Sequence, residues 1–337
     1  MTASGSSETK HVLELDGLRA ISILLVLAAH LLPIGPKWLR LNELAGGMGM
    51  SLFFALSGFL IASTLLSRPD VIDFAVRRTA RILPLAYGYM FLMFVFFTLD
   101  FVGLLYSFGF TINYFTQYLE AAPVAHLWSL CVEMHFYAAI ALVVLTFGRK
   151  GVYLVWPACL AVTLLRIQTG TYYSIFTHLR VDEILAGACV ATIVHAYGRR
   201  PLLYTHVLPL AFLLHAATSS PHAGWLQYLR PYGSAAVLAV TLWTLPGAIH
   251  VLLRSKPARY IANISYALYV FHPLTAYGWM NDGSTATRYL LKRPVSFALT
   301  FVLAHLSTYH WENHFRKWAS NWLARRRARL EEREAGD

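Results

Sequence analysis

Charged residues are scarce in this sequence: Asp, Glu, Lys and Arg make up 13% of its 337 residues, whereas 57% are hydrophobic. So apolar a chain must bury its side chains, which excludes an intrinsically disordered protein. Cysteine is also rare, and Cys131, Cys159 and Cys189 lie inside apolar runs, which excludes a disulfide-stapled secreted fold. The sequence contains neither a P-loop nor a GxGxxG motif. Its mean hydropathy of +0.51 instead indicates an integral membrane protein.

Long apolar stretches recur along the whole chain, and a helix needs about 20 residues to cross the hydrocarbon core of a membrane. They predict an all-α integral membrane protein with about ten transmembrane helices, several of them short. The predicted spans are residues 18–34, 48–66, 83–102, 127–147, 151–166, 182–198, 203–217, 234–253, 260–280 and 295–314. Residues 103–125 are partly apolar but carry Ser107, Asn113 and Gln117, so we expect a re-entrant or interfacial segment there.

The basic residues, which give the chain a formal net charge of +11, indicate its orientation, because Lys and Arg are enriched in cytoplasmic loops. Ten spans with both termini cytoplasmic place most of them inside. An eleventh span through 103–119 would move Arg149, Lys150 and the cluster at 254–259 outside, so we reject it. Topology and contact with membrane lipid thus account for the basic residues, and no aromatic-interleaved basic patch favours a nucleic-acid partner.

This topology divides the chain into three parts. We expect a cytoplasmic N-terminal tail at 1–14, a transmembrane domain at 15–315 and a cytoplasmic C-terminal tail at 316–337. The predicted location is the plasma (inner) membrane, crossed many times. Ionisable residues inside the spans are costly there, and they are therefore the first candidates for function.

Arg19 and His30 are the first such pair. They are eleven residues apart, or about three helical turns, so they share one helix face about 16 Å apart. Arg19 lies near the cytoplasmic end and His30 near the outer end of the first span. Alternatively, Arg19 extends to lipid phosphate and His30 is a hydrogen-bonded core histidine.

Arg77, Arg78 and Arg81 lie at the cytoplasmic start of the third span. Their spacings of three and four residues place guanidinium groups close together, a pattern suited to binding phosphate. Anchoring of the helix by positive charge at the inner face is the alternative.

His126, Ser129 and Glu133 fall near one face of the fourth span, because they are separated by three, four and seven residues. A carboxylate there could orient or charge-stabilise a histidine from another span. A purely structural buried network is the alternative. Tyr269 and His272 share a face of the ninth span, where Pro273 loosens the helix.

Two further patterns have an ordinary structural explanation. Ser57 and Gly58 are small residues of the kind that allows membrane helices to pack closely. His310 and His314 have the spacing of zinc ligands on a helix, but Glu312 is displaced from the HExxH position and no third ligand is evident. We therefore expect no metal.

Taken in order, these patterns resemble the acyltransferase-3 family of bacterial membrane acyltransferases over residues 15–274. The motifs are Arg19 with ten residues before His30, Phe53-Phe-x-x-Ser-Gly-Phe-Leu-Ile, Arg77-Arg-x-x-Arg-Ile-x-Pro, His126-x-Trp-Ser-Leu-x-x-Glu-x-x-Phe-Tyr and Ser265-Tyr-x-x-Tyr-x-x-His. Each motif alone is weak, but five in order along about ten spans are specific.

The resemblance implies an O-acyltransferase that moves an acyl group, often acetyl, from cytoplasmic acyl-coenzyme A to a hydroxyl of a carbohydrate beyond the membrane. Acyl-coenzyme A is then a co-substrate, and no cofactor is bound permanently. Carried over by position, Arg19 and His30 match the essential pair of the family, Arg77 begins its basic motif and Glu133 is its glutamate. Because the chain ends soon after the last predicted span, we expect no fused extracytoplasmic domain.

The mechanism that we expect uses His30 as a general base, because histidine gains and loses a proton near neutral pH. Glu133 would stabilise the imidazolium, and Ser57, Ser129 or Tyr269 the thioester oxyanion. His126 and His272 are further candidates for binding substrate. An acyl-histidine at His30 is the alternative route.

The acceptor itself is open: cell-surface polysaccharide, lipid-linked oligosaccharide or a glycosylated natural product. Aromatic residues outside the spans either stack on its sugar rings or form an interfacial belt. These are Tyr172, Tyr173, Trp225, Tyr228, Tyr232 and Trp279. A transporter or flippase of lipid-linked sugars is the alternative function, and it predicts no thioester cleavage. A structural membrane protein would tolerate replacement of Arg19, His30 and Glu133.

Overall fold

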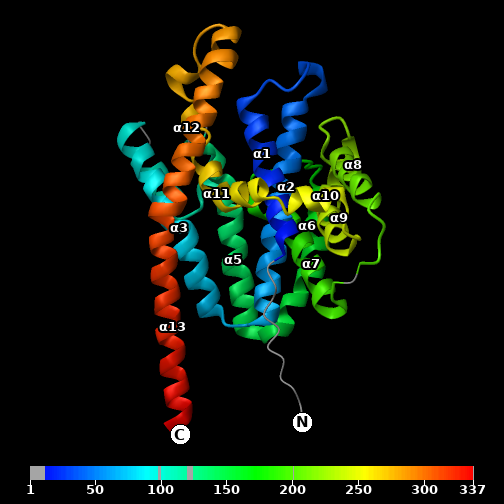
Figure 1. Cartoon of the computed structure of the whole chain (residues 1–337), viewed down its shortest axis with the longest axis vertical. Helices are drawn as coiled ribbons and strands as arrows, with labels where there is room; N and C mark the ends of the chain where they lie inside the picture. The colour runs from blue at the N-terminus through cyan, green and yellow to red at the C-terminus, as the bar shows by residue number, and fades with distance from the viewer. Residues whose placement is uncertain (1–11, 98–99, 120–123, 200, 337) are drawn as a thin grey trace.

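The computed structural model describes residues 12–97, 100–119, 124–199 and 201–336, and it is a bundle of helices (Figure 1). Within these ranges the β-structure is a single isolated bridge between Leu203 and Thr244, so the predicted all-α class is confirmed. Residues 1–11 of the predicted N-terminal tail, residues 120–123 and Asp337 lie outside the described residues.

The α-helices follow one another along the chain, joined by short 3-10 turns and by two π-helical segments. Their bounds are α1 Leu13–Leu31, α2 Leu41–Ser67, α3 Val71–Phe96, α4 Phe101–Phe108, α5 Trp128–Phe147, α6 Val155–Gln168, α7 Asp182–Tyr197, α8 Val207–Ser219, α9 Arg230–Trp243, α10 Ala248–Leu253, α11 Lys256–Phe271, α12 Arg293–Leu306 and α13 Asn313–Gly336. The π-helical segment Ser307–Glu312 joins α12 to α13.

Each predicted span overlaps a helix, but several of them are not one continuous helix. The span 234–253 is interrupted between α9 and α10, and 260–280 extends past the end of α11 at Phe271. The span 83–102 extends past the end of α3 at Phe96, and residues 98–99 within it lie outside the described residues. Of the described residues, three stretches are long and apolar enough to cross a membrane: Lys37–Ser67, Val71–Phe96 and Ala125–Gln168. The other crossings and the side on which the termini lie stay predictions. Within 103–125 the described part is the end of the eight-residue α4 followed by 3-10 turns, too short to cross.

Helix α2 lies at the centre of the bundle and crosses α7 at two glycines. A Cβ at Gly58 would lie 1.8 Å from the carbonyl oxygen of Ile184, and one at Gly187 would lie 1.9 Å from that of Ala55. Each glycine therefore touches the backbone of the opposite helix. The close packing predicted at Gly58 is confirmed, and its partner is Gly187.

We expect Gly187→Ala to destabilise the protein strongly, because the added methyl forces two central helices apart. Overpacking of this kind costs about 1–3 kcal/mol or more. The measurement is the melting temperature of protein in lipid nanodiscs. Gly88→Ala is the matched control, because nothing lies within 4 Å of a Cβ there. A Gly187→Ala protein as stable as this control would contradict the close contact.

The predicted C-terminal tail is mostly α13, which runs alongside α3 (Figure 1). Ala319 is buried against the rest of the protein. Arg326 donates to Asp70 at 2.6 Å, and Arg327 donates to Asp73 at 2.5 Å. Burial raises the pKa of the Asp70 carboxyl, but hydrogen bonds from the Asp73 backbone N–H and from Arg326 lower it by more, so this pKa lies below its usual range.

We expect the double variant Asp70→Asn, Asp73→Asn to release α13 in part. Because the pKa of Asp70 is lowered by folding, its contribution is present at neutral pH and is lost as the pH falls through that lowered value. Trypsin cleavage within α13 at neutral pH should become about fivefold faster, as expected for two partly exposed ion pairs. The exposed Asp282 provides the control variant Asp282→Asn. Equal cleavage of both variants would contradict this docking.

Candidate active site

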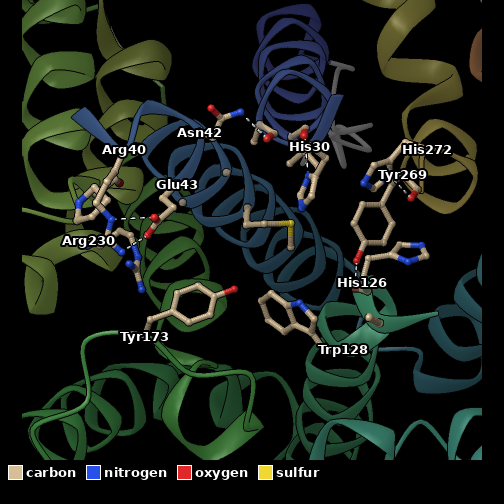
Figure 2. A pocket seen from close by; sticks show the side chains of 18 of the residues that line it. His30, Arg40, Asn42, Glu43, His126, Trp128, Tyr173, Arg230, Tyr269 and His272 are labelled. Carbon is tan, nitrogen blue, oxygen red and sulfur yellow. Dashed lines mark hydrogen bonds and ion pairs between the residues drawn. The ribbon is translucent and has the colours of Figure 1, made fainter. Parts of the chain in front are cut away.

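A cavity of about 800 Å³ opens between α1, α2, α9, the start of α5 and the end of α11 (Figure 2). It lies at the His30 end of α1, which the topology predicts to face outward. Five predicted site residues are near it, and four of them line it: His30, His126, Tyr269 and His272. The fifth, Ser129, bonds to the Tyr269 hydroxyl at 2.7 Å.

Three histidines from different parts of the chain converge at the cavity. The ring centroids of His30 and His272 are 5.0 Å apart, and those of His126 and His272 are 5.4 Å apart. His30 Nδ1 lies 2.8 Å from the carbonyl oxygen of Val26. A carbonyl only accepts, so in the neutral ring Nδ1 carries the proton and Nε2 is the acceptor nitrogen, without a hydrogen bond among the described residues. His30 is exposed where it lines the cavity, and it is thus equipped to accept a proton.

The hydroxyl of Tyr269 joins two of these elements. It donates its one proton to the backbone carbonyl of His126, so Ser129 must donate to Tyr269. His272 Nδ1 lies 2.7 Å from the Tyr269 carbonyl oxygen, which leaves its buried Nε2 as an acceptor without a hydrogen bond among the described residues. The carbonyl of Tyr269, three residues earlier in the chain, therefore holds the His272 ring in place at the end of α11.

Glu133 lies deeper in the bundle, where it accepts hydrogen bonds from the hydroxyls of Ser57 and Tyr137. It follows His126 by seven residues on the helical run into α5, which corresponds to about 10 Å along the axis. His30 instead bonds to the Val26 carbonyl and contacts the His272 ring. The sequence spacing placed Glu133 and His126 on one face, but they lie at different depths.

A basic cluster formed by Arg19, Arg78 and Arg81 lies beyond Glu133, toward the end of the bundle opposite the cavity. The Arg78 guanidinium is 5.8 Å from the centre of the Tyr137 ring. Arg81 is within electrostatic range of Arg19, Arg78 and Arg316. Helices α1, α3 and α13 thus each contribute to this group of four arginines, whereas the sequence predicted a phosphate-binding cluster on one helix only.

Arg77 is the exception among the predicted phosphate-binding residues. It is exposed and donates to Asp73, one turn earlier in α3, at 2.7 Å. It therefore points away from the cluster formed by Arg19, Arg78 and Arg81. Of the three arginines predicted to bind phosphate, the structure therefore brings Arg78 and Arg81 to this cluster but not Arg77.

An ion network below the cavity was not predicted. Arg166 pairs with Asp182 at 2.6 Å, and Glu183 pairs with Arg230 at 2.7 Å and with Arg180 at 3.3 Å. All five side chains are at most 3% exposed. The available signal was the run Arg180-Val-Asp182-Glu183, three ionisable residues at the start of an apolar stretch.

The chain was compared with protein families and known proteins. A family model described as an acyltransferase domain matches residues 12–309. The chain is 25% identical to the peptidoglycan O-acetyltransferase OatA of Listeria monocytogenes, over 91% of this chain and 56% of that protein. It is 27% identical to a putative peptidoglycan O-acetyltransferase, YrhL, of Bacillus subtilis, over 78% of this chain and 48% of that protein.

A putative O-acetyltransferase of Staphylococcus aureus strain COL is 24% identical over 93% of this chain and 59% of its own length. The chain thus spans about half the length of the curated relatives that it matches. No solved structure matches it. Because the family model covers most of its residues, the protein belongs to the acyltransferase-3 family.

Proposed function

We propose that the protein is a membrane O-acetyltransferase that moves an acetyl group from acyl-coenzyme A to a hydroxyl of a carbohydrate. The observation that carries this proposal is the free Nε2 of His30 at a cavity large enough for a sugar, in a family whose relatives are named O-acetyltransferases. Two relatives are named for peptidoglycan, a carbohydrate polymer, which favours a cell-surface polysaccharide as the acceptor.

In this mechanism His30 Nε2 takes the proton of the acceptor hydroxyl as the oxygen attacks the thioester carbonyl. The tetrahedral intermediate then collapses, the carbon–sulfur bond breaks, and the coenzyme A thiolate leaves and is protonated from His30. Of the three oxyanion candidates, only Tyr269 is among the residues that line the cavity, so we assign this role to its hydroxyl. To donate to the oxyanion, this hydroxyl must give up its hydrogen bond to the His126 carbonyl. An acyl-histidine would form at the same Nε2, and acetyl trapped on His30 without acceptor would favour that route.

The donor enters from the opposite end in this proposal. Arg19, Arg78 and Arg81 hold the phosphates of coenzyme A, and the pantetheine arm passes the layer of Ser57 and Glu133 toward the cavity. Glu133 then supports the imidazolium by its charge, without a hydrogen bond to it. This arrangement requires the arginines to face the cytoplasm and the cavity to face outward, across the plasma membrane.

The test is release of free thiol from acetyl-coenzyme A by purified protein in lipid nanodiscs, with and without mixed glycan acceptors. We expect release that depends on the acceptor, accompanied by acetylated glycan. A transporter or flippase would move lipid-linked sugar across a vesicle membrane and release no thiol. Movement of such a lipid without thiol release would contradict the proposed function.

A further inference from the structure

The ion network below the cavity carries an excess of positive charge. Its members are three arginines, Arg166, Arg180 and Arg230, and two carboxylates, Asp182 and Glu183. The neighbouring cavity residues Arg40 and Glu43 pair with each other and leave the balance unchanged. One positive charge is therefore uncompensated within the network, and every member of the network is buried. A buried charge without a counter-charge is costly, unless a ligand supplies one.

Arg180 and Arg230 differ in how they meet the cavity. The Arg180 guanidinium lies 4.6 Å from the centre of the Tyr173 ring and 5.5 Å from that of Trp128, and its Nε and Nη2 have no hydrogen bond among the described residues. Arg230 lines the cavity itself. Its Nε donates to Glu183 and its Nη2 donates to the Tyr172 carbonyl. Its Nη1 has no hydrogen bond among the described residues, so the Nη1 donors are available to a ligand.

Aromatic rings line the cavity along one edge, next to its charged side. Figure 2 shows Arg230 on one side, His30 and His272 on the other, and the rings of Tyr173 and Trp128 next to each other below them in this view. Aromatic rings provide flat apolar surfaces for the apolar face of a sugar ring. Of the aromatic residues predicted outside the spans, Tyr172 and Tyr173 line the cavity.

We propose that Arg230, backed by Arg180, binds a monoanionic group of the acceptor while the acceptor hydroxyl meets His30. This inference rests on the proposed function and names its substrate class: an acidic glycan rather than a neutral one. One surplus charge matches one negative charge, such as the carboxylate of a uronic acid or the phosphodiester of a phosphate-linked glycan. A guanidinium binds either group through charge-assisted hydrogen bonds.

The test is a binding titration on the native protein in nanodiscs, without acetyl-coenzyme A. The probes are a glucuronate-containing trisaccharide, its carboxyl-reduced neutral counterpart and a trisaccharide joined by a phosphodiester. We expect one acidic probe or both to bind about tenfold more tightly than the neutral one, as for one charge-assisted hydrogen bond. The tighter acidic probe identifies the source of the charge. Equal binding of all three probes would overturn the proposal without any variant.

Variants then assign the preference to Arg230. Arg230→Gln should abolish the preference for the acidic probe. Arg230→Lys keeps the charge but loses the paired N–H donors of the guanidinium, so it should keep part of the preference. The double variant Arg40→Gln, Glu43→Gln is the matched control, since both residues line the cavity and pair with each other. Removing both leaves the net charge of the cavity unchanged, and this variant should keep the full preference. An acidic preference that survives in a folded Arg230→Gln protein would overturn the assignment.

The result can be separated from that of the proposed function. If the acidic probe binds preferentially but no glycan is acetylated, the binding site stands and the acetyltransferase proposal fails. If neutral and acidic glycans bind equally and both are acetylated, the enzyme stands and the acidic acceptor is refuted.

Discussion

His30→Ala is expected to reduce acceptor-dependent thiol release from acetyl-coenzyme A by about 10²–10⁴-fold, the usual effect of removing a general base. The loss follows from geometry, because His30 alone in the cavity combines an exposed ring with an Nδ1 held by a backbone carbonyl. Its Nε2 is therefore the nitrogen that would accept the proton in the proposed mechanism. The rate should fall at saturating concentrations of both substrates, since a proton transfer is lost rather than binding.

A matched control for this prediction is His195→Ala, at the exposed last turn of α7 and outside the cavity. It should retain the native rate. His272→Ala tests the neighbouring ring: it should lower the rate by a smaller factor, because His272 is almost fully buried at the cavity wall and contacts the His30 ring. Full activity of a folded His30→Ala protein would refute the general-base role, and equal losses in all three variants would point to a folding defect.

The sequence was most informative where the chemistry lies on one helix. Arg19 and His30 are on α1 as predicted, and each predicted span overlaps a helix of the described residues. Spacing along a helix determines which residues share a face, but it does not determine the depth at which another helix meets them. This is why Glu133 could be placed on the face of His126, while its hydrogen bonds to Ser57 and Tyr137 could not be foreseen.

Contacts between distant segments were the least predictable part of the site. Arg230 and Glu183 are 47 residues apart in sequence, and no local pattern links them. Arg316 was assigned to the C-terminal tail, because Arg81, which it influences electrostatically, lies on α3, far earlier in the chain. Arg77 and Arg78 are adjacent and chemically identical, yet helix rotation turns one toward solvent and Asp73 and the other toward Tyr137. Sequence spacing alone did not separate these two arginines.

The difference between these arginines provides the sharpest test of the donor site. Each of the variants Arg78→Gln and Arg81→Gln should raise the KM for acetyl-coenzyme A by about tenfold to hundredfold, since each removes a charge-assisted hydrogen bond to phosphate. The rate at saturating donor should change little, because binding of phosphate far from the reacting carbonyl is equal in the ground and transition states. Steady-state kinetics with varied acetyl-coenzyme A measures both quantities.

Arg77→Gln is the matched control, one residue away and of the same chemistry, and it should leave the KM for acetyl-coenzyme A within about twofold, because its guanidinium is held by Asp73. Retained binding of the glycan probes in the cavity would show that the arginine variants are folded. If Arg77→Gln raised the KM as much as Arg78→Gln does, the phosphates would lie at the exposed surface of α3. A different result would be a lower rate at saturating acetyl-coenzyme A with an unchanged KM. Arg78 and Arg81 would then act on passage of the pantetheine arm toward the cavity, and not on binding of the phosphates.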